Sequence, residues 1–236
     1  MLNRYLLPLL FLGLIACTDD SDEVNIISHE VNHAESNLEF FLMDTVSRSN
    51  FYSFGKVKTH LKKDGKDLIF AMNGGMFNPD YQAVGLYIEN GKTFSPLNID
   101  HDQEGNFFLL PNGIYGISND NEPFVKKTSS FDDNSNVKFA TQSGPMLVIN
   151  GKIHPKFKKD SENLNIRNGV GILPNGNSLF AISDTEINFY DFALFFKEQG
   201  CENALFLDGF VSKMYLPEEG EDDLGGEFGV IIAEYE

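Results

Sequence analysis

Ala204 to Tyr215 reads Ala-Leu-Phe-Leu-Asp-Gly-Phe-Val-Ser-Lys-Met-Tyr, and this stretch near the C-terminal end organises the fold. An apolar run leads into one carboxylate, Asp208, and Gly209 follows at once. Such a run, bounded by a glycine, predicts a buried strand. A carboxylate at the end of a buried strand is costly unless it is paired, hydrogen-bonded or protonated. Asp208 is therefore either a structural hydrogen-bond anchor or a base, nucleophile or metal ligand, and the residues alone favour neither.

The composition of the 236-residue chain indicates an ordinary globular protein with an unusual choice of aromatic residues. It has 22 phenylalanines and no tryptophan, and its formal net charge is -17. So large a negative charge argues against nucleic acid, or an anionic membrane surface, as the main partner. No nucleic-acid partner is therefore predicted.

The first residues have the pattern of an export signal. A short basic start at Met1 to Arg4 precedes an apolar stretch, Tyr5 to Ala16, that is too short to span a bilayer comfortably. Small residues before Cys17 resemble a bacterial lipobox, which implies that residues 1–16 are a lipoprotein signal peptide and that Cys17 is acylated. An ordinary signal peptide or a buried N-terminal helix are the alternatives. We expect an exported protein, lipid-anchored at the outer membrane or cell surface, whose only membrane contact is this anchor.

Residues 17–37 are predicted to be an acidic and polar tether, because dense charge without aromatic residues follows Cys17. The folded domain is then expected over residues 38–236. With Cys17 acylated, Cys201 has no partner within the chain, and it is interpreted as a small buried apolar residue rather than a nucleophile.

Within the domain, short apolar runs separated by turns predict strands, and helical spacing is rare. Strands are expected over 67–72, 85–89, 106–110, 113–117, 139–149, 179–183 and 228–232. One helix is predicted from the spacing of Phe189, Phe192, Ala193 and Phe196, with Gly200 suited to its C-terminal cap. The predicted fold class is α+β, a mixed and largely antiparallel sheet with a few covering helices in a single domain.

Polar turns rich in glycine follow several of these strands. They are Asn73-Gly74-Gly75, Gln142-Ser143-Gly144, Arg167-Asn168-Gly169 and Asp208-Gly209. Glycine lets a backbone approach a ligand closely, and exposed N–H groups in such turns can cradle an anion. Arg167 would add a bidentate clamp for phosphate or carboxylate. Each turn alone is also typical of ordinary loops, so the prediction of one shared site depends on their meeting in space.

Known cofactor and metal patterns are missing from the sequence. The histidines form no close ligand pair apart from His29 and His33, which lie in the polar N-terminal stretch, so no metal site is predicted. No phosphate-binding loop and no dinucleotide fingerprint occurs. No cofactor is predicted, and a divalent cation is left open.

The ordered motifs resemble one known family. They are Ala71-Met-Asn-Gly-Gly-Met-Phe, Asn106-Phe-Phe-Leu-Leu-Pro-Asn-Gly-Ile, Gln142-Ser-Gly-Pro-Met-Leu-Val, Arg167-Asn-Gly-Val-Gly and the stretch from Ala204 to Tyr215. Together they resemble the phosphodiester glycosidase family of the lysosomal uncovering enzyme, and more closely its bacterial branch known as domain of unknown function DUF2233. In the uncovering enzymes a second glycine usually follows the Asp-Gly pair, whereas Phe210 stands here.

This resemblance implies hydrolysis of a sugar-1-phosphodiester at its glycosidic C–O bond, giving a free sugar and a phosphomonoester. It implies that Asp208 activates water or stabilises oxocarbenium character, and that Arg167 and turn N–H groups stabilise the leaving phosphate. Asn73, Gln142 and Ser143 would position sugar hydroxyls or the phosphate. Ser212 would bond to the substrate, with Gly74, Gly75, Gly144, Asn168 and Gly209 lining the site.

Two other functions fit the same residues. The chain could be a non-catalytic glycan-binding lipoprotein on the same fold, or a phosphodiesterase that cleaves the P–O bond. In each case the expected partner is a phosphorylated glycan or a sugar phosphodiester.

Overall fold

The structure is a computed structural model that describes residues 25–44, 46–100, 102–209 and 211–236. The predicted signal peptide, the acylated Cys17 and Phe210 lie outside the described residues. Within the described part, no helix is both long and apolar enough to cross a bilayer.

Three larger sheets and one small hairpin make up the fold, and the strand pairs described are antiparallel. The six-stranded sheet has the order β1 (Ile26–Val31), β14 (Ser178–Ser183), β13 (Asn168–Ile172), β15 (Ala204–Phe206), β11 (Met146–Ile149) and β12 (Lys152–Ile153). The five-stranded sheet runs β7 (Lys92–Ser95), β6 (Tyr87–Glu89), β10 (Val137–Ser143), β8 (Gly113–Ser118) and β9 (Pro123–Lys127). The four-stranded sheet runs β16 (Met214–Tyr215), β5 (Leu68–Asn73), β17 (Ile231–Tyr235) and β2 (Asn37–Phe41), and β3 (Met43–Asp44) pairs with β4 (Ser49–Asn50).

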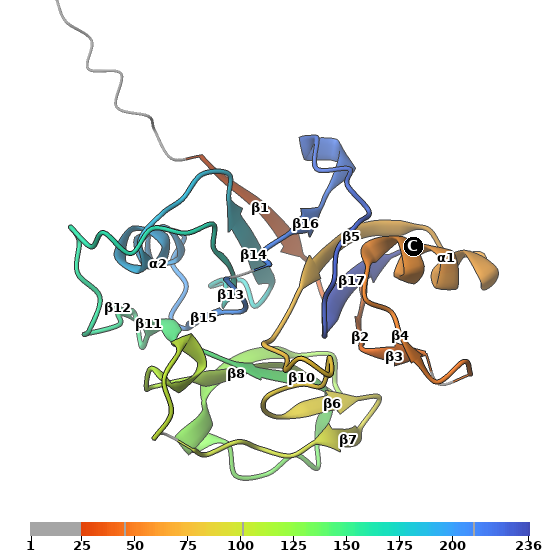
Figure 1. Cartoon of the computed structure of the whole chain (residues 1–236), viewed down its shortest axis with the longest axis horizontal. Helices are drawn as coiled ribbons and strands as arrows, with labels where there is room; N and C mark the ends of the chain where they lie inside the picture. The colour runs from red at the N-terminus through yellow and green to blue at the C-terminus, as the bar shows by residue number, and fades with distance from the viewer. Residues whose placement is uncertain (1–24, 45, 101, 210) are drawn as a thin grey trace, which may run out of the picture.

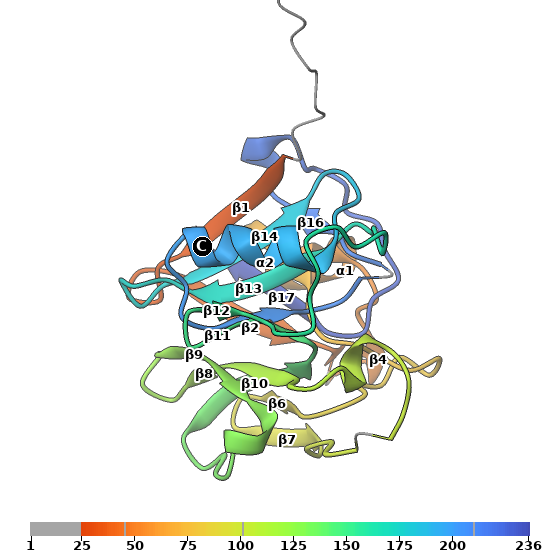
Figure 2. The same cartoon turned by 90° about the vertical axis from the view of Figure 1, so that its left-hand side faces the viewer.

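The larger sheets face one another around a common core, and each α-helix covers one outer face (Figures 1 and 2). Helix α1 (Phe54–Lys63) packs Phe54, Val57 and Leu61 against the four-stranded sheet. Helix α2 (Phe189–Glu198) packs against the six-stranded sheet. The predicted α+β class, largely antiparallel and in one domain, is confirmed, although the strands form separate sheets rather than one.

The strand that precedes Asp208 is buried on both of its faces. Leu205 and Leu207 enter the common core, whereas Ala204 and Phe206 lie in the cluster beneath α2. Side chains along a strand alternate between its faces, so a strand between two apolar layers needs a continuous apolar run. The run that opens the sequence argument is therefore explained by this position.

Phenylalanine fills the common core. Phe40 stacks on Phe139 and Tyr115 at centroid distances of 5.4 and 5.7 Å, and Phe180 lies 5.0 Å from Phe70. These rings come from different sheets, so ring packing joins the sheets to one another.

The predicted helix near residue 190 is confirmed, and its ends have clear causes. The side chain of Asn188 accepts from the Asp191 N–H at the N-terminus. Gly200, at φ 84°, takes the left-handed conformation just beyond the C-terminus. Cys201 follows with only 1% exposure, and burial raises the pKa of its thiol to about 11, which confirms its interpretation as a buried residue.

Two local predictions were wrong. Residues 106–110 were expected to be a strand, but Asn106–Phe108 forms the 3-10 helix η1. Only Phe107 of that apolar run is buried, and Leu110 remains 42% exposed, so no sheet needs the run. The expected polar loop after residue 123 instead begins with β9, which pairs with β8. Two further 3-10 helices are η2 (Thr128–Ser130) and η3 (Pro217–Glu219).

The predicted boundary at residue 38 was also wrong, because strand β1 lies inside the supposed tether. Its six residues pair with β14 from Ile26 opposite Ser183 to Val31 opposite Ser178. The polar side chains of β1 have partners in the fold rather than in solvent alone. His29 Nε2 lies 2.5 Å from Glu234 Oε2, and Glu30 accepts from the side-chain amide of Asn177 at 2.6 Å. Composition alone could not show these partners.

Candidate functional site

Several of the predicted turns meet where the larger sheets come together. Asn73 ends β5 of the four-stranded sheet, and Ser143 ends β10 of the five-stranded sheet. Asn168 begins β13, and Asp208 follows β15, both in the six-stranded sheet. We call Asn73, Ser143, Asn168 and Asp208 the junction cluster. Each of its members is at most 7% exposed.

Side-chain amides connect the members of the junction cluster. Asn168 Nδ2 donates to the backbone oxygen of Asn73 at 2.8 Å and to Asn73 Oδ1 at 3.0 Å. Asn168 Oδ1 accepts from the backbone N–H of Asp208 at 2.9 Å. One buried asparagine therefore fixes the chain on both sides of it, the Asn73 turn and the start of the Asp208 loop.

The amide nitrogen of Asn73 has no hydrogen-bond partner among the described residues, although the side chain is only 1% exposed. Its oxygen accepts from both Asn168 Nδ2 and the Lys213 backbone N–H, the latter at 2.8 Å. Exchanging the two ends of the amide would set donors against donors, so this orientation is the consistent one. A buried donor without an acceptor costs about 1–3 kcal/mol. Such a group is a candidate for binding a ligand oxygen.

The Asn73 turn is held against β10 by close backbone contacts. Gly75 has φ 96°, and a Cβ atom there would lie 2.2 Å from Thr141 Oγ1. Thr141 Oγ1 donates to the backbone oxygen of Gly74 at 3.3 Å, and the Gly74 N–H donates to Val230 O at 2.9 Å. Only glycine fits at position 75, because both the conformation and the space exclude a side chain.

The Asp208 loop is fixed from two sides. Ser143 Oγ donates to the backbone oxygen of Leu207 at 2.5 Å, and Ser212 Oγ donates to the backbone oxygen of Asp208. Gly209 lies against the ring of Phe206, where a Cβ atom would be 2.7 Å from the ring carbon Cζ. Ser143 and Ser212 thus position the loop that carries the carboxylate.

Gln142 is one residue from Ser143 but points elsewhere. Its amide oxygen accepts from the backbone N–H groups of Leu86 and Asn98 at 3.0 and 2.9 Å. Its amide nitrogen donates to Asn98 O at 2.7 Å and to Thr128 Oγ1 at 3.2 Å. These bonds anchor the loop after β7, so Gln142 lies outside the junction cluster.

Arg167 is likewise placed away from the cluster, and it does not form the predicted phosphate clamp. The side chain is 1% exposed, with Cζ 3.6 Å from the ring centre of Phe189 on α2. Nε donates to Ile187 O at 2.7 Å, and Nη2 donates to Asn163 O at 2.8 Å. Burial lowers the pKa of Arg167 to about 10. In this structure the guanidinium holds the loop before β13 onto α2.

Chemically, the junction cluster combines one carboxyl group with amide, hydroxyl and backbone groups. Lys213, the nearest cation in sequence, pairs its Nζ with Asp223. No group of three His, Cys, Asp or Glu side chains within the described residues is placed to hold a metal. Such a site suits a ligand rich in hydroxyl and phosphoryl oxygens. Sequence analysis gave no signal for two supporting groups, Thr141 and the Lys213 N–H.

Comparison with known proteins identifies the relatives of the chain. The sequence profile of the phosphodiester glycosidase family matches residues 66–227. An uncharacterised protein of Escherichia coli K12, YigE, is 43% identical over 147 residues, which are 62% of this chain and 57% of that protein. The chain thus spans little more than half the length of this relative.

Solved structures share the fold at low sequence identity. The catalytic domain of zebrafish N-acetylglucosamine-1-phosphodiester alpha-N-acetylglucosaminidase, auto-inhibited by its pro-peptide, matches 91% of this chain and 83% of its own, with TM-score 0.58 and 15% identity. An exported protein of Burkholderia pseudomallei K96243 matches 89% of this chain and 73% of its own, with TM-score 0.55 and 9% identity.

Proposed function

Because the chain belongs to the phosphodiester glycosidase family, we propose that it hydrolyses a sugar-1-phosphodiester to a free sugar and a phosphomonoester. The observation that carries the proposal is the junction cluster. Three sheets deliver Asp208 and a buried, unpartnered amide donor to one place. A polar cavity wall with one carboxyl group and unsatisfied donors is what a hydroxyl-rich substrate requires.

In the proposed reaction, Asp208 accepts a proton from a water molecule whose oxygen bonds to the anomeric carbon. The bond between that carbon and the phosphate oxygen breaks, and its electron pair leaves with the phosphate. Because phosphate is a good leaving group, little proton donation to it is needed. The Asn73 amide N–H donates to a sugar hydroxyl or a phosphate oxygen and replaces the partner that it lacks in the free protein.

Asn168 and Ser143 act through position in this proposal. Asn168 fixes both Asn73 and the Asp208 backbone, and Ser143 fixes Leu207 beside it. Arg167 supports the site from the α2 side rather than by contact with phosphate. As part of the same proposal, the protein is exported and anchored by a lipid on Cys17, which places it where envelope or exogenous glycans occur.

The test is product analysis with a panel of sugar-1-phosphodiesters in ¹⁸O-labelled water, using the full chain. Label in the sugar supports the glycosidase, and label in the phosphate assigns P–O cleavage instead. Binding without turnover assigns a glycan-binding protein. Asp208→Asn is expected to lower kcat by about 10²–10⁴-fold, the range typical of a lost general base. Asp132→Asn, at an exposed position, is the matched control and is expected to keep full activity.

A further inference from the structure

A second cavity lies at the edge of the molecule, between the β3–β4 hairpin and the β6–β7 hairpin, on the side where Figure 1 labels these strands. Its volume is about 440 Å³, within the range of small-molecule sites. Tyr81, from the loop between β5 and β6, lies in its wall together with Glu89 and Phe94. None of these residues belongs to the junction cluster.

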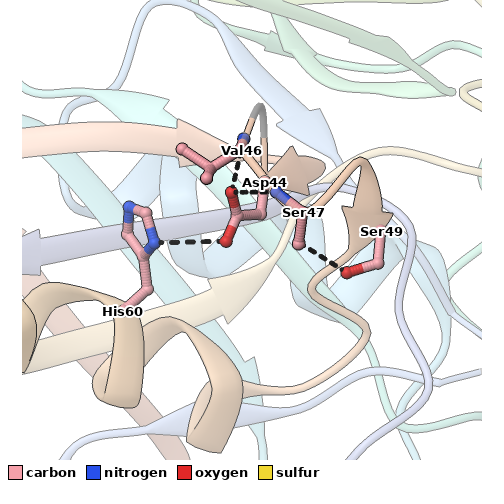
Figure 3. A network of polar contacts seen from close by, with 5 residues as sticks. All are labelled: Asp44, Val46, Ser47, Ser49 and His60. Atoms are coloured by element: carbon pink, nitrogen blue, oxygen red, sulfur yellow. Dashed lines mark hydrogen bonds and ion pairs between the residues drawn. The ribbon is translucent and has the colours of Figure 1, made fainter.

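The walls of this cavity are fixed by hydrogen bonds. Asn50 Nδ2 donates to the backbone oxygen of Tyr81 at 3.1 Å, which joins the β3–β4 hairpin to the loop. Figure 3 shows how the hairpin itself is held. Asp44 Oδ1 accepts from the backbone N–H groups of Val46 and Ser47, and its Oδ2 lies 3.7 Å from His60 Nδ1 on α1. The cavity is therefore preformed rather than a gap between mobile loops.

Tyr81 occupies its place at a conformational cost. Its φ of 58° lies in the left-handed region, which a bulky residue adopts at a cost of about 1–3 kcal/mol. The ring stacks on Phe77 with a centroid distance of 5.3 Å, and its hydroxyl donates to Glu227 at 3.2 Å. Strain of this kind at a cavity wall is typical of functional positions.

Glu89 supplies a half-buried carboxyl group that the proposed hydrolysis does not use. It accepts from the hydroxyl of Tyr87 at 2.5 Å and from the backbone N–H of Leu42. A carboxylate has about four acceptor positions, so these two donors leave capacity for a ligand. Burial raises the pKa of Glu89, and the nearby charge of Glu39 raises it further.

The charges around the cavity select against anions. Its described lining includes the acids Asp80 and Glu89 and no lysine, arginine or histidine. Phe94, 39% exposed, already has an ammonium group over its ring, because Lys92 Nζ lies 4.8 Å from the ring centre. An aromatic face next to a carboxylate is the arrangement that binds ammonium groups.

We propose that this cavity is a second binding site, for a sugar or other small polar ligand that carries a primary amine. The ammonium group binds the Glu89 carboxylate, and the body of the ligand lies against Phe94 and Tyr81. A phosphate-bearing group is repelled by the same carboxylates. The site is separate from the junction cluster and does not depend on the hydrolysis proposed for it.

Calorimetric titration of the full chain with a matched pair of probes tests this proposal. The 2-aminoethyl and 2-hydroxyethyl glucosides have nearly the same shape and differ in charge. We expect the amine to bind at least about tenfold more tightly than the alcohol, as a charge-assisted contact predicts. Equal binding of the two probes, or binding of neither, overturns the proposal.

Variants place the bound amine. Glu89→Gln keeps the acceptor oxygen for Tyr87 and Leu42 but removes the charge, and we expect it to weaken amine binding about tenfold. Phe94→Ala, at a partly exposed ring, is a second variant with little effect on folding and should also weaken binding. Asp132→Asn and Asp208→Asn should leave it unchanged. Loss of binding in Asp208→Asn, or full binding in Glu89→Gln, would show that the amine binds elsewhere.

Discussion

Arg167 and Asn168 are neighbours in sequence, both are buried, and both carry side-chain donors, yet they do opposite work. The Arg167 guanidinium donates to loop carbonyl groups and packs on Phe189. Asn168 belongs to a cluster in which the Asn73 amide nitrogen has no partner among the described residues. A buried polar group with its partners present supports the fold. One that lacks a partner keeps binding capacity for a ligand, at a cost in stability.

The largest expected effect that tests this comparison is on the Arg167 side. Arg167→Met removes the donors to Ile187 O and Asn163 O and the ring contact, so we expect a loss of about 3–5 kcal/mol in the free energy of unfolding. Denaturant titration measures it. The protein that remains folded should keep kcat within about threefold of the original, because the guanidinium lies outside the junction cluster.

Arg167→Lys separates charge from shape in the same experiment. Lysine keeps the positive charge but cannot form the planar contact with Phe189 or donate in two directions, so we expect most of the stability loss to remain. A stable Arg167→Met protein without turnover would reverse the comparison and return the phosphate-clamp role to Arg167.

Sequence reasoning found the turns but could not tell which side chain of each turn faces the site. In the Gln142-Ser143 and Arg167-Asn168 pairs, the larger and more chemically suggestive residue points away, and its neighbour faces the junction cluster. Successive side chains of a strand point to opposite faces, so an offset of one residue changes the prediction completely. The facing residue depends on the sheets against which the strand packs.

The fold was predictable where local signals were strong. Helix α2 has helical spacing and a glycine at its end, and the fold class follows from many short apolar runs. Strand β1 was missed because its polar residues are paired by distant ones, Glu234 and Asn177, more than a hundred residues away in sequence. No local pattern contains that information.

A smaller effect is expected at the unpartnered donor itself. Asn73→Ala removes the free N–H and also the acceptor of the Lys213 N–H. We expect about a hundredfold loss in kcat/KM, comparable with the loss of one donor to a transition state, and only about 1 kcal/mol in stability. Steady-state kinetics and denaturant titration on the same preparation measure both. If stability falls and kcat/KM does not, the free donor is a packing defect and the comparison with Arg167 fails.

The smallest effect concerns His33, whose Nδ1 is a second buried atom without a partner among the described residues. Its Nε2 lies 2.9 Å from Ser178 Oγ, and burial lowers the pKa of His33 from 6.5 to about 4. A neutral imidazole can leave a lone pair at Nδ1 without a donor, and this costs less than an unpaired N–H. His33 is therefore a structural group whose unpartnered atom needs no ligand, provided that it stays neutral.

This difference predicts a pH dependence. Between pH 6.5 and about 4 the unfolded chain protonates His33 and the folded chain does not, so stability falls as the pH falls through this window. We expect the fall to be about 1–2 kcal/mol, less than the full pKa difference corresponds to, because burial is incomplete. Denaturant titrations at several pH values should show a shallower slope in His33→Gln than in the original chain. An unchanged slope would mean that His33 is already protonated in the fold, and its Nδ1 would then be an unpaired donor of the same kind as Asn73 Nδ2.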